Sequence, residues 1–180
     1  MIVTEAEWTQ PHSDCAHPER WHATDPQSTE LEVTELVAAF VRALQPDYVV
    51  ETGTCVGNTA EAIGRALQAN GQGRLVSLEI DPNLVERARA RCEGLPVEIV
   101  QAPSMQWEPQ EPIGFAFFDS LVGLRIQELE RYRPWLASGT IVGFHDTAPH
   151  HGYGHALERI NWIRTIRLRT PRGVTFAEVL

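Results

Sequence analysis

Strand-like runs, largely apolar, alternate along the chain with longer segments in which apolar residues recur every three or four positions. The strand-like runs lie at 48–50, 75–81, 97–100, 113–119 and 139–146. The other segments have the spacing of amphipathic helices. One, at 28–44, precedes the first strand-like run, and the rest, at 58–70, 82–93 and around Ile126 and Leu129, lie between the runs. Strands that alternate with helices in this way form a parallel sheet covered on both faces. The pattern therefore predicts a doubly wound, Rossmann-like α/β fold.

The C-terminal part of the chain departs from this alternation. Strand-like runs at 165–169 and 174–180 are joined by Thr170-Pro171-Arg172-Gly173, which has the residues of a hairpin turn. We therefore expect an antiparallel hairpin at the end of a mostly parallel sheet. Residues 28–180 then form a single domain.

Residues 1–27 have no sustained period. We expect them to form an irregular arm that lies on the domain. A lid over the functional site is the alternative, because aromatic and histidine side chains are unusual in a free tail. The side chains that suggest the lid are Trp8, His12, His17, Trp21 and His22.

The composition narrows the function classes. The 180 residues carry a net charge of −9, so nucleic acid is an unfavourable partner. The three cysteines are odd in number and lack metal-site spacing, which favours a reduced, cytoplasmic setting. No run is long enough to cross a bilayer, so we do not expect a membrane partner. The chain contains no lysine, which removes lysine as a catalytic base.

The first strand runs into a glycine-bearing turn that spans Glu51 to Gly57. We expect Gly53 to allow the sharp turn and Gly57 to let a ligand approach the main chain. Two glycines at this spacing are not the three-glycine fingerprint of dinucleotide-binding proteins. The carboxylate of Glu51 would repel a pyrophosphate and attract a cation, such as the ammonium group of an amino acid.

Three helix starts carry capping signals. Asp81-Pro82 is an N-cap followed by proline. Asn58 with Glu61, and Thr29 with Glu32, each have the spacing of a capping box.

Acids and a histidine stand where the expected parallel strands end, namely at Glu51, Glu79, Asp119, His145 and Asp146. Open parallel sheets bind ligands beyond the carboxyl ends of their strands. Glu79 follows the glycine turn at about the distance of an acid that accepts the hydroxyls of a ribose. We therefore expect a ligand that contains a nucleoside to lie across these strand ends.

The Glu-x-Gly-x-x-x-Gly turn resembles motif I of the class I S-adenosylmethionine (SAM) methyltransferases. Thr59, two residues after the second glycine, makes it similar to the small O-methyltransferases of the catechol type. The segment Glu79-Ile80-Asp81-Pro82 and residues 136–147 extend the resemblance. It implies a seven-stranded sheet with SAM as the cofactor. The cofactor contacts that we expect are Ser28, Thr29, Glu51, Gly53, Gly57, Thr59, Glu79, Ser104, Met105 and Asp119.

Within this implied site, each part of SAM has its own contacts. Glu51 and Thr59 would hold the amino-acid end, and Glu79 would hold the ribose. The loop at Ser104-Met105 would lie against the adenine. The chain at 27–29 would touch the methionine part, or else it simply caps the following helix.

The same resemblance directs the chemistry to Asp119, His145 and Asp146. The two acids end neighbouring strands and could share Mg²⁺ or another divalent ion, which would hold a substrate hydroxyl and lower its pKa. Catechol-type enzymes use a lysine base and an asparagine ligand, whereas this chain lacks lysine and has Thr147 at the asparagine position. His145 is then the expected general base. A strand-end histidine bonded to a loop is the alternative.

Three further histidines, His150, His151 and His155, follow in a loop. They are candidates for a base or for the ligands of a softer metal. A polar loop without a chemical role is the simpler interpretation.

Taken together, the residues predict a SAM-dependent methyltransferase that acts on a hydroxyl oxygen of a small molecule. A SAM-fold binding or regulatory protein without transfer activity is an alternative, because lysine is missing and no cap domain is evident. An NAD-linked oxidoreductase is disfavoured by the missing third glycine. The sequence leaves the acceptor and the oligomeric state open, and a homodimer is among the options.

Overall fold

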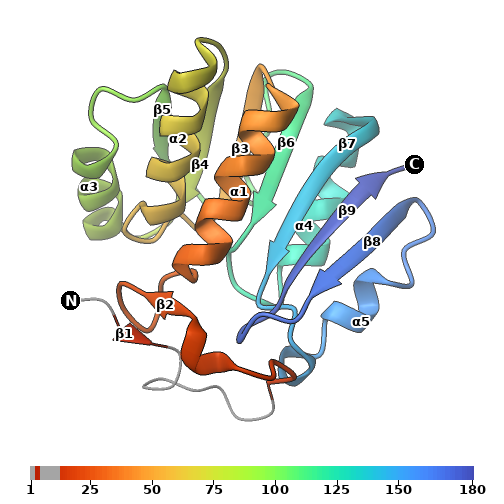
Figure 1. Ribbon diagram of the computed structural model, residues 1–180. Coiled ribbons are helices and arrows are strands. Elements are labelled where there is room, and N and C mark those ends of the chain that lie inside the picture. Colours follow the sequence, from red (N-terminus) through yellow and green to blue (C-terminus); the bar gives the residue numbers. More distant parts are fainter. Residues whose placement is uncertain (1–2, 5–12) are drawn as a thin grey trace.

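A computed structural model of the chain describes residues 3–4 and 13–180. Its main sheet has seven strands in the order β5-β4-β3-β6-β7-β9-β8 (Figure 1). The strands are β3 (Tyr48–Thr52), β4 (Arg74–Glu79), β5 (Val97–Gln101), β6 (Ile113–Phe118), β7 (Leu136–His145), β8 (Ile163–Leu168) and β9 (Val174–Val179). Strands β3 to β7 are parallel, while β9 pairs antiparallel with both β7 and β8. The predicted parallel sheet with a C-terminal hairpin is confirmed.

Helices cover both faces of this sheet (Figure 1). On one face, α1 (Leu31–Leu44), α2 (Asn58–Asn70) and α3 (Pro82–Arg91) contribute to one hydrophobic cluster. On the other face, α4 (Arg125–Tyr132) and α5 (Gly154–Leu157) contribute to a second cluster. The short helices η2 (Pro18–Arg20), η3 (Arg133–Trp135) and η4 (Pro149–His151) lie in the connections.

The continuous apolar sequence of strand β6 is explained by its position between two hydrophobic clusters. Phe115 and Phe117 belong to the cluster under α1 and α2. Ala116 and Phe118 belong to the cluster under α4. Because successive side chains point to opposite faces, a strand with helices on both sides needs apolar residues at every position.

The chain changes direction between β3 and β6, and this places the site. It runs outward from β3 to β4 and β5, then returns to place β6 on the other side of β3. The carboxyl ends of β3 and β6 therefore border a crevice from which the connections diverge. In the described residues, no helix is both long and apolar enough to span a membrane.

Two of the three predicted caps are wrong. The N-cap of α1 is Glu30, and the N-cap of α2 is Gly57; neither makes a side-chain cap. Thr29 instead donates to Asp119 Oδ2 at 2.7 Å, and Asn58 donates to Ser28 Oγ at 2.8 Å. These polar side chains form hydrogen bonds with residues far away in the sequence and therefore do not cap the helices.

The other local signals are confirmed. Asp81 accepts hydrogen bonds from the backbone N–H groups of Asn83 and Leu84, so it caps α3 as predicted. Helix α2 ends at Asn70, and Gly71 adopts the left-handed conformation that closes it.

The glycine turn after β3 depends on two different constraints. Gly53 has a φ of 84°, and a Cβ there would lie 2.3 Å from the carbonyl oxygen of Asp119. Gly57 has a φ of 83°, and a Cβ there would lie 3.1 Å from Ala88 in α3. The sharp turn expected at Gly53 is thus present. Gly57 permits helix packing and not the approach of a ligand, so that expectation is corrected.

Residues 13–27 lie along the domain below the strand ends, and β2 (His22–Ala23) pairs with β1 (Val3–Thr4) (Figure 1). Asp14 forms an ion pair with Arg167 of β8 at 2.6 Å. Thr24 accepts a hydrogen bond from Asn58 at 2.7 Å. Trp8 and His12, which suggested a lid, lie outside the described residues. The division into an arm and a domain stays a prediction.

Candidate functional site

A cavity of about 560 Å³ opens at the carboxyl ends of the parallel strands. Most of the residues predicted to form the site line this one cavity: Ser28, Thr29, Gly53, Thr59, Glu79, Ser104, Met105, Asp119 and Asp146. They come from the chain just before α1, the glycine turn, the first turn of α2, the end of β4 and the segments after β5, β6 and β7. A volume of this size is typical of a site for a cofactor or a small molecule.

Glu79 stands at the end of β4 beside the glycine turn. One carboxylate oxygen accepts from the Cys55 N–H at 2.8 Å, and the other accepts from the N–H groups of Ile80 and Asp81 at 2.8 and 3.0 Å. The residue is 9% exposed and lines the cavity. These backbone contacts fix the carboxylate while leaving it in reach of a ligand.

Glu51 does not line the cavity, so the predicted contact with the SAM ammonium group is not supported. Its carboxylate is 1% exposed and accepts from Ser77 Oγ at 2.5 Å. Burial raises the pKa of Glu51 to about 8, and the charges of Asp119 and Glu79 add to this rise against the Ser77 hydrogen bond. A neutral, buried carboxyl group fits a structural role behind the turn.

Asp119 and Asp146 come together as predicted, but an arginine stands between them. Arg125 Nη2 lies 3.0 Å from Asp119 Oδ1 and 2.9 Å from Asp146 Oδ2. Asp146 has a left-handed backbone with a φ of 54°, which aspartate tolerates better than most residues. This conformation directs its carboxylate toward the arginine and the cavity.

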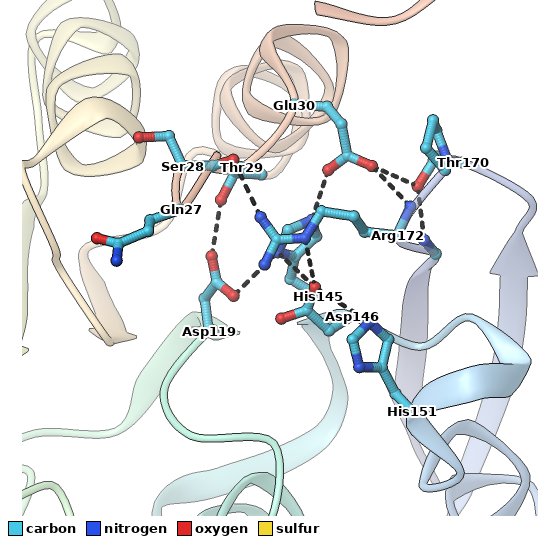
Figure 2. A network of polar contacts seen from close by, with 12 residues as sticks. Gln27, Ser28, Thr29, Glu30, Asp119, His145, Asp146, His151, Thr170 and Arg172 are labelled. Atoms are coloured by element: carbon cyan, nitrogen blue, oxygen red, sulfur yellow. Dashed lines mark hydrogen bonds and ion pairs between the residues drawn. The ribbon is translucent and has the colours of Figure 1, made fainter. Parts of the chain in front are cut away.

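His145 lies beneath these acids, with no exposed surface and no place in the cavity lining. Its Nε2 lies 2.5 Å from Glu30 Oε2, and its Nδ1 lies 3.0 Å from Asp119 Oδ1 (Figure 2). Burial alone would lower the pKa of His145, but Asp119, Asp146 and Glu30 raise it to about 10. An imidazolium that donates from both nitrogens has no lone pair for a substrate proton. The geometry therefore disagrees with the predicted role of His145 as general base.

The C-terminal hairpin turn reaches the same network (Figure 2). Arg172 Nε donates to Asp146 Oδ1 at 2.7 Å, and its Nη1 donates to the Ser28 carbonyl at 3.1 Å. Thr170 Oγ1 and the Arg172 N–H both donate to Glu30 Oε1 at 3.1 Å. The turn thus joins the start of α1 to the end of β7.

Helix α4 carries another buried acid, which the sequence did not reveal. Glu128 has no exposed surface and accepts from Thr52 Oγ1 at 3.0 Å and Ser120 Oγ at 2.7 Å. Ser104 Oγ also donates to it. Glu128 therefore ties the end of β3 to the loops that follow β5 and β6.

Sequence reasoning also missed Arg125 and Arg172, which line the cavity. Arg125 is the first basic residue after Asp119 in a chain without lysine, and this signal could have found it. Arg172 was predicted only as part of a turn, because its contact with Asp146 joins residues that are far apart in the sequence.

The predicted metal ligands come together, but protein groups already occupy them. One ligand atom from each of Asp119, His145 and Asp146 lies within 4.8 Å of the others, so the predicted group does assemble. Every carboxylate oxygen of the two acids, however, already accepts from a protein donor. Both nitrogens of His145 face carboxylates. The site does not fit a hard divalent ion.

The loop histidines lie to one side of this network. His151 Nε2 is 3.5 Å from Asp146 Oδ1, and the rings of His150 and His151 lie 4.0 Å apart. Burial lowers the pKa of His151 to about 4, so its ring is neutral. Neither His150 nor His151 lines the cavity in the described structure.

A protein-family model described as a methyltransferase domain matches residues 50–147. This match covers more than half of the chain, and the chain belongs to that family of methyltransferases. The matched segment contains the glycine turn, Glu79, Asp119 and Asp146. The resemblance to class I SAM-dependent methyltransferases is therefore confirmed.

Solved structures with the same fold support this assignment. A methyltransferase from Geobacter sulfurreducens is 25% identical, with a TM-score of 0.72, over 84% of this chain and 81% of that one. An O-methyltransferase from Bacillus cereus in complex with S-adenosylhomocysteine (SAH) is 17% identical, with a TM-score of 0.73, over 87% and 84%. The O-methyltransferase TomG from Streptomyces achromogenes, involved in tomaymycin synthesis and solved with SAM, is 19% identical, with a TM-score of 0.70, over 86% and 82%. No curated protein sequence matches the chain.

Proposed function

We propose that this methyltransferase transfers the methyl group of SAM to a hydroxyl oxygen of a small molecule. The observation that carries the proposal is a single cavity that contains both Glu79, the acid suited to a ribose, and the charged wall of Asp119 and Asp146. SAM and an acceptor bound side by side would bring the methyl group and the acceptor oxygen together. Structural neighbours solved with SAM or SAH support this choice of cofactor.

The lining residues suggest an orientation for the cofactor. Glu79 would accept hydrogen bonds from the ribose hydroxyls. Ser104 and Met105 would lie beside the adenine. Ser28, just before α1, and Thr59, in the first turn of α2, also line the cavity and would hold the amino-acid end. The methyl group would then face Asp119 and Asp146.

The chemistry that SAM supplies is a methyl group on a positively charged sulfur. With SAM bound, transfer of the methyl group to the acceptor oxygen would break the carbon–sulfur bond and leave SAH as a neutral thioether, and the hydroxyl proton would pass to water. The residues of the chain contribute mainly proximity and orientation. Their fixed network of acids and arginines would orient the acceptor without rearranging during the reaction.

The partners follow from the same features. The cavity suits a small-molecule acceptor, and the net charge of −9 disfavours nucleic acid. Cys15, Cys55 and Cys92 are free thiols, which favours the cytoplasm as the location. A homodimer stays a hypothesis that light scattering would test.

Calorimetry tests the cofactor. We expect SAM and SAH to bind and NAD not to bind, and methylation of a panel of hydroxylated compounds to separate an enzyme from a binding protein. Glu79→Gln should weaken SAH binding by about 1.5–3 kcal/mol, the range for a hydrogen bond to a charged group. Glu98→Gln, at an exposed position on β5, is the matched control. Equal SAH affinity in the Glu79 variant and the wild type would remove Glu79 from the site.

A further inference from the structure

One guanidinium joins the two carboxylates that were expected to hold a metal ion. Arg125 Nη2 bridges Asp119 Oδ1 and Asp146 Oδ2 with contacts of 3.0 and 2.9 Å. Only 3% of the arginine side chain is exposed. The guanidinium therefore lies between the acids, which is where an ion shared by them would have to lie.

Arg125 is held from every side. Its Nε donates to the Ser120 carbonyl at 2.9 Å, and its Nη1 donates to the His145 carbonyl and the Tyr153 hydroxyl. With Nη2 on the two acids, each of the five N–H donors of the guanidinium has an acceptor in the protein. Moving Arg125 away would leave several buried acceptors unpaired, which is unfavourable.

The remaining oxygens of the expected metal site are also engaged. Asp119 Oδ2 accepts from Thr29 Oγ1, and Asp146 Oδ1 accepts from Arg172 Nε, both at 2.7 Å. Thr147, which stands where the related enzymes have an asparagine ligand, is buried and accepts from Thr175 Oγ1 at 2.9 Å. A hard divalent ion takes its ligands from such oxygens.

Two guanidinium groups already neutralise the acids of the expected metal site. Among the described residues, Arg125 contacts both Asp119 and Asp146, and Arg172 contacts Asp146. Two negative charges thus face two positive charges in a buried region. A divalent ion would add two uncompensated charges within a few ångströms of a guanidinium, where repulsion is strong.

We propose that Arg125 takes the place of a divalent metal ion in this site, so that the protein binds its ligands without a metal. Arg125 is a positioning residue, because its donors are used by the protein and it holds Asp119 and Asp146 toward the cavity. The role of Arg125 in place of a metal ion rests on the proposed methyl transfer. The binding of a metal can nevertheless be measured without any turnover.

Mn²⁺ binding to the full chain tests the proposal. Titration followed by electron paramagnetic resonance should show only free Mn²⁺, with or without SAH. Addition of EDTA should leave the SAH affinity unchanged. One Mn²⁺ bound per wild-type chain and lost in Asp146→Asn would overturn the proposal.

Variants on α4 add a matched comparison. Arg125→Met removes the bridging cation and should make Mn²⁺ binding detectable, with an affinity on the order of tenfold or more above the upper limit set by the wild-type titration, because one adjacent positive charge is gone. Arg131→Met is the control: this arginine lies on the same helix, is 30% exposed and pairs with Glu108. A folded Arg125→Met protein with the Mn²⁺ affinity of the wild type would overturn the proposal. If Arg125→Met does not fold, the wild-type titration still decides.

The two proposals fail in different ways. Absence of SAH binding in the wild type would contradict the proposed function, while the Mn²⁺ titration would still decide the role of Arg125. Specific Mn²⁺ binding together with tight SAH binding would contradict only the role of Arg125.

Discussion

His145 shows how surroundings determine the chemistry of a residue. An imidazole near neutral pH is a suitable base, and a strand end is a suitable place for one. Here Glu30 and Asp119 each take one ring nitrogen. The ring is therefore buried between two acids, whose charges raise its pKa to about 10.

Removal of His145 should therefore affect stability first. His145→Ala removes the ion-pair partner of buried Glu30 and one of the partners of Asp119, and we expect the free energy of unfolding to fall by about 3–5 kcal/mol in urea denaturation. His155→Ala, at an exposed position, should change stability by less than about 0.5 kcal/mol. Unchanged stability of His145→Ala, together with loss of the acidic limb of the pH–activity profile, would restore its role as a base.

Glu51 gives the protein a measurable dependence on pH. Its pKa rises from 4.5 to about 8 on folding, so the folded state holds the proton more tightly than the unfolded state. Below pH 4.5 both states are protonated. As pH rises from about 4.5 to about 8, this group makes the folded state progressively less stable.

Glu51→Gln isolates this effect, because the amide oxygen can still accept from Ser77 and does not ionise. We expect the variant to be more stable than the wild type at pH 9, on the order of a few kcal/mol, with the difference shrinking as pH falls toward 5. Urea denaturation across this pH range measures it, with Glu98→Gln as the control. A difference that does not change with pH would show that Glu51 is ionised in the folded protein.

At the scale of elements, helix α2 begins and ends with glycines of similar conformation but different surroundings. Gly57 and Gly71 have φ values of 83° and 74°. A Cβ on Gly57 would meet Ala88 of α3 at 3.1 Å, whereas a Cβ on Gly71 would have no heavy atom within 4 Å. Only Gly57 adds a packing constraint to the backbone constraint.

The two alanine variants separate these constraints. Gly71→Ala should destabilise the protein by about 1–2 kcal/mol, the cost of a left-handed backbone for a residue with a Cβ. Gly57→Ala should cost about 1–3 kcal/mol more, because α3 must move to avoid the added methyl group. Thermal and urea unfolding would measure both. Equal losses would mean that α3 adjusts freely.

For the whole molecule, the site is assembled from segments at opposite ends of the chain. The start of α1, the ends of β6 and β7, helix α4 and the C-terminal hairpin turn meet at the carboxyl edge of the sheet (Figures 1 and 2). The contact between Glu30 and His145 spans 115 positions, and that between Glu30 and Arg172 spans 142. Because both ends of the domain converge here, folding and site formation are coupled.

The order of the elements and the edge of the sheet that binds ligands can be predicted from the pattern of residues along the chain. Strands such as β6 are apolar at every position because helices cover both of their faces, and this pattern is visible without coordinates. The same pattern predicts where the strands end, and therefore that the acids at the ends of β4, β6 and β7 lie at one edge of the sheet. The capping boxes failed because Thr29 and Asn58 met distant partners that a local pattern cannot contain.

The chemistry between those acids depends on contacts that form only in the folded protein. Arg125 reaches Asp119 and Asp146 because α4 begins beside the ends of two neighbouring strands. Both ring nitrogens of His145 face carboxylates, because Glu30 approaches the ring from the start of α1 and Asp119 approaches it from the end of β6. Burial and partner charges, which determine protonation and ion binding, depend on distances in space between residues far apart in sequence. The residue types revealed where the site lies, whereas the folded arrangement determined which of their charges remain free to act.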